Sequence, residues 1–248
     1  MIHREYKRIV KGSDTAVLFI HGIMGTPYQF RELVPLVPES WSVHNLLLPG
    51  HGKDPEAFSR SSMREWEKKT QKAFQKLAKT HDNIIIVGHS MGTFLSIELA
   101  LSHPDKVKLL FLQAVPLTPM LRYRALKYAH AILYQNEAKD TPDEAVARVS
   151  YSIEPDKNPV KYMGWYKRFL ELFAKAWNIR KKLRYITTPC IAVQSRKDEL
   201  VSNQAEKILR KYKGIATYAL KDSSHYIYSK EDKEKMLSYF EEAIKKVK

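Results

Sequence analysis

A serine, an acidic residue and a histidine occupy positions in this chain from which they can act together as a nucleophilic catalyst. Residues 88–92 read G-H-S-M-G, with Ser90 at the centre. The four β-branched residues before this motif predict a buried strand, and residues 93–101 predict a helix. Glycines on both sides of a serine fit a sharp, strained strand-to-helix turn. Such a turn would hold the Ser90 hydroxyl outward, at the positive end of the helix dipole.

A serine hydroxyl is a poor nucleophile at its ordinary pKa, so it needs a base, and the base needs a carboxylate to orient it. Asp198 follows a predicted strand over residues 190–194, and His225 follows another over residues 216–220. Because the carboxyl ends of parallel strands meet at one edge of a sheet, we expect both side chains to converge on Ser90.

Two other carboxylates and one other histidine compete for these assignments. Glu199 and Asp222 lie near Asp198 and His225 in the sequence, and either is an alternative partner for the base. We expect Glu199 to face solvent and Asp222 to cap the loop that carries His225. His89 precedes the serine directly, so we expect its ring to point away from the hydroxyl.

Hydrolysis also needs N–H donors for the oxyanion that forms in the transition state. We assign one donor to the backbone of Met91, the residue after the serine. The second is expected in the H-G-I-M-G-T segment, residues 21–26, which directly follows a predicted strand over residues 16–20. We assign it to Ile23, since the glycines beside it let the backbone approach a substrate carbonyl closely.

Strand and helix patterns alternate along both ends of the chain. The predicted strands are residues 9–10, 16–20, 42–48, 84–87, 107–112, 190–194 and 216–220. The predicted helices are residues 26–37, 61–80, 93–101, 202–212 and 230–246. This alternation predicts an α/β fold, with a mostly parallel central sheet and helices on both faces.

The middle of the chain breaks this alternation, because it holds only helical patterns. We therefore expect residues 1–115 and 189–248 to form the core domain, and residues 116–188 to form an inserted helical cap, or lid. The many aromatic residues of the cap fit either a substrate pocket or ordinary packing on the core. Six residues are predicted to contact substrate: His21, Gly22, His89, Tyr123, Trp165 and Phe169.

The chain is strongly basic, with 42 Lys and Arg against 27 Asp and Glu and a net charge of +15. These charges are spread along the sequence and accompany no nucleic-acid-binding motif, so we expect no nucleic-acid partner. No apolar run approaches the roughly 20 residues of a membrane span, and we expect no stable membrane insertion. Residues 121–135 form a basic amphipathic stretch that suits transient lipid-surface contact and an ordinary cap helix equally well. The absence of a secretory signal pattern and the single cysteine, Cys190, predict a cytoplasmic protein.

Three motifs and two single residues together resemble the α/β-hydrolase superfamily. They are residues 21–25 (HGIMG), 48–52 (LPGHG) and 88–92 (GHSMG), with Asp198 and His225. Within the superfamily the chain is most similar to bacterial carboxylesterases and monoacylglycerol lipases, over its whole length except the cap. The resemblance implies that His51 shapes its loop. A serine nucleophile argues against the dehalogenase and epoxide hydrolase branches. No metal-ligand set and no G-x-G-x-x-G motif is present, so no cofactor is expected.

We therefore expect a serine hydrolase that cleaves short- to medium-chain acyl esters, including monoacylglycerols, through an acyl-enzyme intermediate. Its partner would be a small-molecule ester, and the sequence does not indicate an oligomeric state. Thioesterase, lysophospholipase and amidase chemistry on the same residues stay open. Two alternatives from other classes are a non-catalytic binding protein with this fold and a nucleic-acid binder driven by the positive charge.

Overall fold

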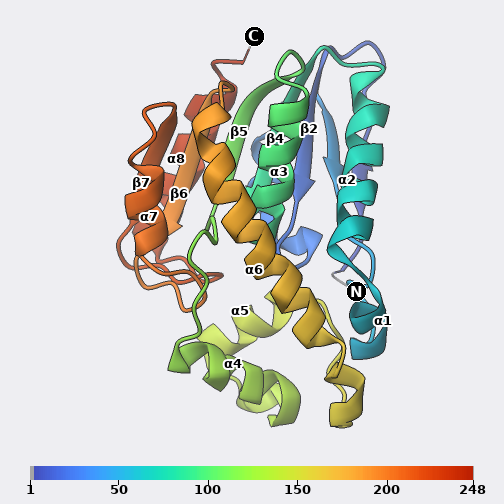
Figure 1. Ribbon diagram of the computed structural model, residues 1–248, viewed down its shortest axis with the longest axis vertical. Helices are drawn as coiled ribbons and strands as arrows, with labels where there is room; N and C mark the ends of the chain where they lie inside the picture. The colour runs from blue at the N-terminus through green and yellow to red at the C-terminus, as the bar shows by residue number, and fades with distance from the viewer. Residues whose placement is uncertain (1–2, 248) are drawn as a thin grey trace.

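The computed structural model describes residues 3–247, and this part of the chain forms one sheet of seven strands covered by helices (Figure 1). The strand order is β1-β3-β2-β4-β5-β6-β7. Only the pairing of β1 with β3 is antiparallel, and every other neighbouring pair is parallel. The strands are β1 Tyr6–Arg8, β2 Thr15–Ile20, β3 Ser42–Asn45, β4 Asn83–His89, β5 Val107–Gln113, β6 Cys190–Ser195 and β7 Ile215–Leu220. The predicted α/β class with a mostly parallel sheet is confirmed.

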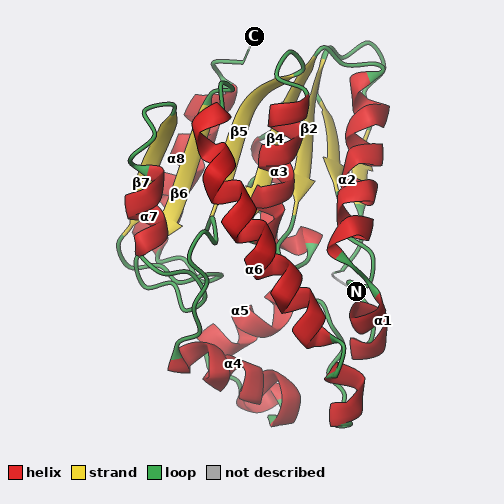
Figure 2. Ribbon diagram, viewed as in Figure 1, coloured by secondary structure: helices red, strands yellow, loops and turns green. Residues whose placement is uncertain are grey.

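Helices connect the parallel strands, as a parallel sheet requires (Figure 2). The α-helices are α1 Pro55–Arg60, α2 Met63–Ala78, α3 Met91–Ser102, α4 Tyr123–Tyr134, α5 Pro142–Ser150, α6 Trp165–Lys182, α7 Gln204–Leu209 and α8 Lys230–Ile244. Short 3-10 turns are η1 Pro27–Phe30, η2 Val34–Leu36, η3 Glu137–Lys139, η4 Pro159–Tyr162 and η5 Leu183–Tyr185. Over residues 3–247, no helix combines the length and the apolar character that crossing a bilayer would require.

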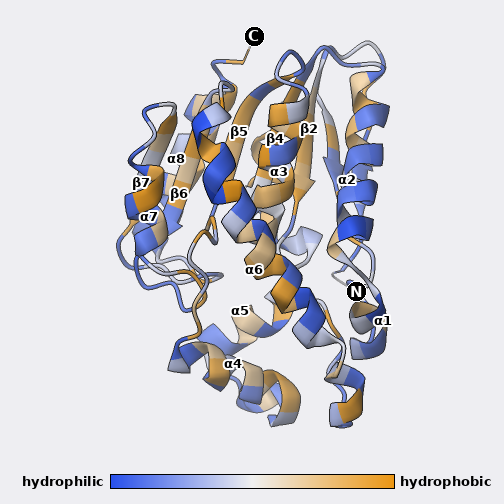
Figure 3. Ribbon diagram, viewed as in Figure 1, coloured by the Kyte–Doolittle hydropathy of each residue, from blue (hydrophilic) through white to orange (hydrophobic). Residues whose placement is uncertain are grey.

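Alternate residues of each central strand enter two separate cores, because successive side chains of a strand point to opposite faces. On one face Leu18 and Ile86 pack with helices α2, α3, α6 and α7. On the other face Phe19 and Val87 pack with α8 and with the residues around η1 and η2. Figure 3 shows the central strands as largely apolar ribbons between these layers. Burial on both faces explains why these strands read as continuous apolar runs in the sequence.

The segment between β5 and β6 holds α4, α5 and α6, and α4 and α5 lie beyond the carboxyl ends of the strands (Figure 1). Helix α5 begins with a capping box, in which the Thr141 hydroxyl accepts the Glu144 N–H and the Glu144 carboxylate accepts the Thr141 N–H. Helix α6 extends back over the sheet and packs against α1, α2 and α3. Residues of its second half, Ala176 and Ile179, belong to the main core. The division into a core and a cap over residues 116–188 stays a prediction.

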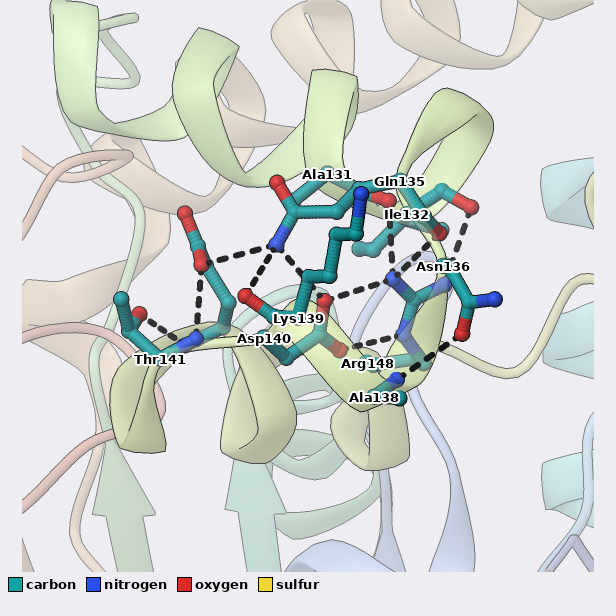
Figure 4. Close-up of polar contacts among 10 residues, drawn as sticks. Ala131, Ile132, Gln135, Asn136, Ala138, Lys139, Asp140, Thr141 and Arg148 are labelled. Carbon is teal, nitrogen blue, oxygen red and sulfur yellow. Dashed lines mark hydrogen bonds and ion pairs between the residues drawn. The ribbon is translucent and has the colours of Figure 1, made fainter.

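Arg148 of α5 joins the two helices beyond the sheet (Figure 4). Its guanidinium donates to both carboxylate oxygens of Asp140, at 2.7 and 2.9 Å. It also donates to the backbone carbonyls of Ala131 at 2.8 Å, Ile132 at 3.1 Å and Gln135 at 3.3 Å. One side chain of α5 therefore bonds the carbonyls at the C-terminal end of α4, where the helix itself supplies few N–H donors.

Several predicted elements differ from the structure for local reasons. Residues 26–37 form η1 and η2 rather than one helix, because Pro35 lacks the N–H that a continuous helix needs. The edge strand lies at β1 rather than at residues 9–10. Strand β3 ends at Asn45, and further on the Leu48 N–H donates to the side chain of His21 instead of to a neighbouring strand. Helix α1 was not predicted, although the cap residue Asp54 and Pro55 in the first turn are typical of a helix start.

Candidate active site

Ser90 lies at the turn between β4 and α3 in a backbone conformation that is rare for a residue with a side chain. Its φ is 51° and its ψ is −125°. The Ser90 N–H donates to the Gln113 carbonyl at 2.9 Å, and the Thr93 N–H and hydroxyl donate to the Ser90 carbonyl at 2.9 and 2.6 Å. A conformation of this kind costs free energy and persists only where its surroundings hold it. The predicted strained strand-to-helix turn is therefore present.

Two glycines allow the chain to pack this tightly around Ser90. A Cβ at Gly92 would collide with the backbone carbonyl of Ile20, at the end of β2. A Cβ at Gly22 would lie 2.7 Å from the Ser90 Cβ and 3.3 Å from its Oγ. The loop after β2 is thus in direct contact with the serine, as the assignment of Ile23 requires.

Asp198 and His225 form a buried pair next to this turn. The Nδ1–H of His225 donates to Asp198 Oδ2 at 2.8 Å, and each residue is only 1% exposed. The other carboxylate oxygen, Oδ1, accepts the N–H groups of Leu200 at 2.7 Å and Val201 at 2.8 Å. The aspartate is thereby fixed on both of its oxygens, and it in turn fixes the tautomer of the imidazole.

The remaining ring nitrogen of His225, Nε2, is buried and has no hydrogen-bond partner within residues 3–247. Burial alone would lower the pKa of His225, but the charge of Asp198 and its hydrogen bond raise that pKa above the ordinary value of 6.5. A neutral imidazole protonated on Nδ1 leaves Nε2 as a proton acceptor. This arrangement is what a general base needs.

Glu199 does not face solvent, so that expectation is wrong. It is 1% exposed, and its Oε2 accepts the backbone N–H of His225 at 3.1 Å. Burial raises the pKa of the Glu199 carboxyl above its ordinary value. Its own carbonyl accepts the N–H of Arg122, next to the first turn of α4. The segment before α4 is therefore bonded to the backbone of Glu199, a tertiary contact that local sequence patterns do not reveal.

Asp222 does not cap the His225 loop, and that expectation is also wrong. Its side chain is 61% exposed and pairs with Lys197 at 2.7 Å. Asp232, in the first turn of α8, caps the loop instead. Its Oδ2 accepts the Asp222 N–H at 2.7 Å and the Ser223 hydroxyl at 2.8 Å. An acid early in the following helix was the available sequence signal for this cap.

Two buried histidines hold the loops around the site. The Nε2 of His21 accepts the Leu48 N–H at 3.0 Å, so its Nδ1–H donates to the Gly22 carbonyl at 2.9 Å. Burial holds the pKa of His21 well below 6.5. The ring of His89 lies 4.9 Å from the ring of His225, and its Nε2–H donates to the His225 carbonyl at 3.2 Å. Burial lowers the pKa of His89 to about 3. Both rings are therefore neutral at ordinary pH.

The predicted oxyanion donors lie in the two segments that adjoin Ser90. Met91 opens α3, whose first-turn N–H groups have no partner within the helix. Ile23 is 6% exposed and lies in the loop that contacts the serine through Gly22. The roles of both backbone groups, and substrate contact by His21, Gly22 and His89, stay predictions.

The three predicted cap contacts occupy different environments. Tyr123 is 82% exposed at the start of α4. The ring of Trp165 lies 4.9 Å from that of Phe58, and its indole N–H donates to the Pro55 carbonyl at 3.0 Å. Phe169 is partly buried against the main core. Trp165 therefore joins α6 to α1, and substrate contact by any of the three stays a prediction.

A small cavity lies against His89 and His225, with Gln29 and Ser150 also in its wall. Its volume is about 30 Å³, which is room for little more than one water molecule. Within residues 3–247, neither amide atom of Gln29 has a hydrogen-bond partner, and neither does His89 Nδ1.

No group of three or more metal-binding side chains is found within residues 3–247. The polar groups of the candidate site are the Asp198 carboxylate, the His225 imidazole and the hydroxyl of Ser90 on its strained turn.

Relatives of known function have the same fold. A carboxylesterase of Bacillus subtilis (strain 168) is 25% identical over 204 residues, which are 80% of this chain and 78% of that protein. A thermostable monoacylglycerol lipase of Bacillus sp. (strain H-257) is 30% identical over 96 residues, 38% of each chain. The crystal structure of Paleococcus ferrophilus monoacylglycerol lipase superposes with a TM-score of 0.69 at 15% identity, and covers 98% of this chain and 99% of that one.

The alpha/beta hydrolase fold family matches residues 15–146, which include β2, the Ser90 turn and β5. The resemblance drawn from the motifs is thereby confirmed, and the chain belongs to the α/β hydrolase fold family, with carboxylesterases and lipases among its relatives.

Proposed function

We propose that this protein is a serine hydrolase that cleaves carboxylic esters through an acyl-enzyme intermediate. The observation that carries the proposal is the buried Asp198–His225 pair. Its Nε2 has no hydrogen-bond partner within residues 3–247, and the His225 ring lies 4.9 Å from the ring of His89, the residue that precedes Ser90 on the strained turn. An oriented imidazole with an uncommitted nitrogen is the base that a serine hydroxyl lacks.

In the proposed reaction, His225 removes the proton of the Ser90 hydroxyl as its oxygen attacks the ester carbonyl. Asp198 stabilises the imidazolium that forms. The backbone N–H groups of Ile23 and Met91 donate to the oxyanion. His225 then gives the proton to the departing alcohol, and water repeats the cycle on the acyl-enzyme to release the carboxylic acid.

The test is covalent labelling with a fluorophosphonate, which reacts with an activated serine. Ser90→Ala should abolish labelling and ester turnover, because it removes the nucleophile. Ser102→Ala is the matched control. This serine is exposed at the other end of α3, so its replacement should leave labelling and ester turnover unchanged. Continued labelling of the Ser90→Ala protein at another residue would overturn the assignment.

Short- to medium-chain acyl esters, monoacylglycerols included, are the proposed substrates. The carboxylesterase and monoacylglycerol lipase relatives support this class. The test is a chain-length series of nitrophenyl esters, assayed beside an acyl-CoA, a monoacylglycerol, a lysophospholipid and an anilide. It distinguishes hydrolysis of the proposed esters from thioesterase, lysophospholipase and amidase activity. Absence of turnover on the whole panel would favour a binding protein instead.

A further inference from the structure

Helix α6 presents a continuous apolar stripe to solvent. Tyr166, Leu170, Phe173 and Trp177 are 59%, 60%, 49% and 63% exposed. Their spacing of three and four residues places them along one side of the helix. We call the exposed residues of this helix the α6 face: Tyr166, Lys167, Leu170, Phe173, Ala174, Trp177, Asn178, Arg180 and Lys181. Figure 3 shows apolar and polar segments alternating along α6 where it crosses in front of the sheet.

All the charges on the α6 face are positive. Lys167, Arg180 and Lys181 are exposed, and none of them joins an ion pair within residues 3–247. The Lys181 ammonium lies over the Trp177 ring, 3.1 Å from its centroid. The acid of this helix, Glu171, is turned inward, where it pairs with Arg168 at 2.9 Å. The face thus combines aromatic side chains with cations and lacks an acid.

The fold does not need the α6 face, because the opposite side of the helix already anchors it. Leu172, Ala176 and Ile179 are buried in the main core. On the same side the Lys175 ammonium pairs with Glu67 and Glu98. Leaving large apolar side chains in water brings no benefit to the folded state, so such a patch marks an interaction surface.

We propose that the α6 face docks the protein on an anionic lipid bilayer surface. Aromatic and leucine side chains partition into the interface between head groups and acyl chains, while lysine and arginine reach the lipid phosphates. The net charge of +15 attracts the whole molecule to the same surface. Pairing with a second copy is disfavoured, because it would bring two unneutralised cationic faces together.

The basic amphipathic stretch of residues 121–135, which contains α4, is a weaker candidate for this role. It exposes Leu121, Tyr123 and Leu126, but Lys127 lies 3.6 Å from Glu144 of α5. Part of its positive charge is therefore neutralised. Leu126, 52% exposed, serves as a matched apolar control outside the α6 face.

The experiment is flotation of the full chain with vesicles of phosphatidylcholine alone, or of phosphatidylcholine mixed with phosphatidylglycerol. We expect binding to the anionic vesicles that weakens as salt is added. Leu170→Ser with Phe173→Ser should lower the partition coefficient by about tenfold for each side chain removed. Lys167→Gln with Lys181→Gln should lower it by about fivefold for each charge. Leu126→Ser should have little effect.

Three outcomes would overturn the proposal: equal binding to both vesicles, unchanged binding of the double variants, or a dimer in solution that Leu170→Ser with Phe173→Ser dissolves. The last outcome would assign the face to a second copy. Turnover of a water-soluble nitrophenyl ester should be the same in all these variants, and Ser90→Ala should still bind vesicles. If the protein hydrolyses the ester but does not bind vesicles, only the docking role of the α6 face is rejected. If it binds vesicles but does not hydrolyse the ester, only the proposed ester hydrolysis is rejected.

Discussion

At the scale of single residues, the buried carboxylate of Glu199 is the least expected part of the site. It accepts the backbone N–H of the residue that would serve as the base. Glu199→Leu would leave that N–H buried without a partner, which costs about 1–3 kcal/mol. Glu199→Gln keeps an acceptor oxygen in the same place. We therefore expect the leucine variant to lose stability and about tenfold in kcat, and the glutamine variant to lose much less.

Urea unfolding and steady-state kinetics of both Glu199 variants measure these effects separately. A loss of stability with kcat unchanged would mean that Glu199 supports only the fold. A loss of kcat at constant KM in the leucine variant, largely restored in the glutamine variant, would identify it as a positioning residue for His225.

The pH dependence of turnover tests the proposed base. His225 must be neutral to accept a proton, and Asp198 raises its pKa above 6.5. We therefore expect kcat/KM to fall as the pH drops through a midpoint above 6.5. Asp198→Asn removes the charge and should lower kcat by about 10³–10⁴ while moving that midpoint to lower pH. A midpoint that stays in place in Asp198→Asn would contradict the pairing seen here.

The positions of Ser90, Asp198 and His225 in the fold could be predicted from local motifs, while their catalytic roles stay predictions. Ser90 follows a strand and precedes a helix, and Asp198 and His225 each lie a few residues after a strand, so the parallel strands bring them to one edge of the sheet. Glu199 could not be predicted in the same way. It lies only one position from Asp198, and its contacts are tertiary: its carboxylate accepts the N–H of His225, and its backbone carbonyl accepts the N–H of Arg122, more than 70 residues earlier in the chain.

At the scale of elements, the junction between α4 and α5 depends on one side chain. Arg148 bonds three carbonyls at the end of α4 and both oxygens of Asp140 (Figure 4). Arg148→Met should release the end of α4 and speed proteolysis near residues 131–140 by about tenfold or more. Arg148→Lys keeps the charge but not the planar fork, so we expect an intermediate rate.

Limited proteolysis followed by mass spectrometry locates the cleavage, and thermal unfolding of the uncleaved protein reports on the rest of the molecule. We expect the main transition to change little, because the hydrogen bonds of Arg148 go to Asp140 and to the end of α4 rather than to the sheet. Cleavage at an unchanged rate in Arg148→Met would show that other contacts hold the two helices together.

The elements themselves were predicted where an apolar period was long enough to read. Helices α2, α3 and α8 and the central strands lie close to their predicted ranges. The pattern did not reveal that α6 returns to pack on α2 and α3. Its sequence offers two apolar sides, one of which lies in the core and one in solvent, and only the folded chain distinguishes them.

At the scale of the whole molecule, buried neutral histidines make stability depend on pH. Burial lowers the pKa of His51 to about 4 and that of His89 to about 3, and it lowers the pKa of His21 as well. In the unfolded chain each would titrate near 6.5. Below that pH the unfolded state binds protons that the folded state cannot, so their stabilising contribution is present above pH 6.5 and is lost as the pH falls.

Two other groups of the site act in the opposite direction. The raised pKa of His225 contributes stability that is complete below pH 6.5 and disappears as the pH rises through the folded value. The raised pKa of Glu199 likewise favours the folded state at lower pH. Between pH 6.5 and 4.5 only Glu199 of these two groups still opposes the three histidines, so we expect a net loss of stability over that range.

His51→Asn isolates one of these contributions. The Nδ1–H of His51 donates to the Pro49 carbonyl at 3.1 Å, and an asparagine amide can replace that donor without titrating. Each histidine contributes about 1.4 kcal/mol per pH unit once the unfolded form is protonated. Urea unfolding of His51→Asn should therefore give a free energy of unfolding that falls less steeply below pH 6 than that of the unaltered chain, by about this amount. Equal slopes would mean that His51 is protonated in the folded protein, and the neutral ring inferred from its burial between His21, Phe58 and Trp66 would be wrong.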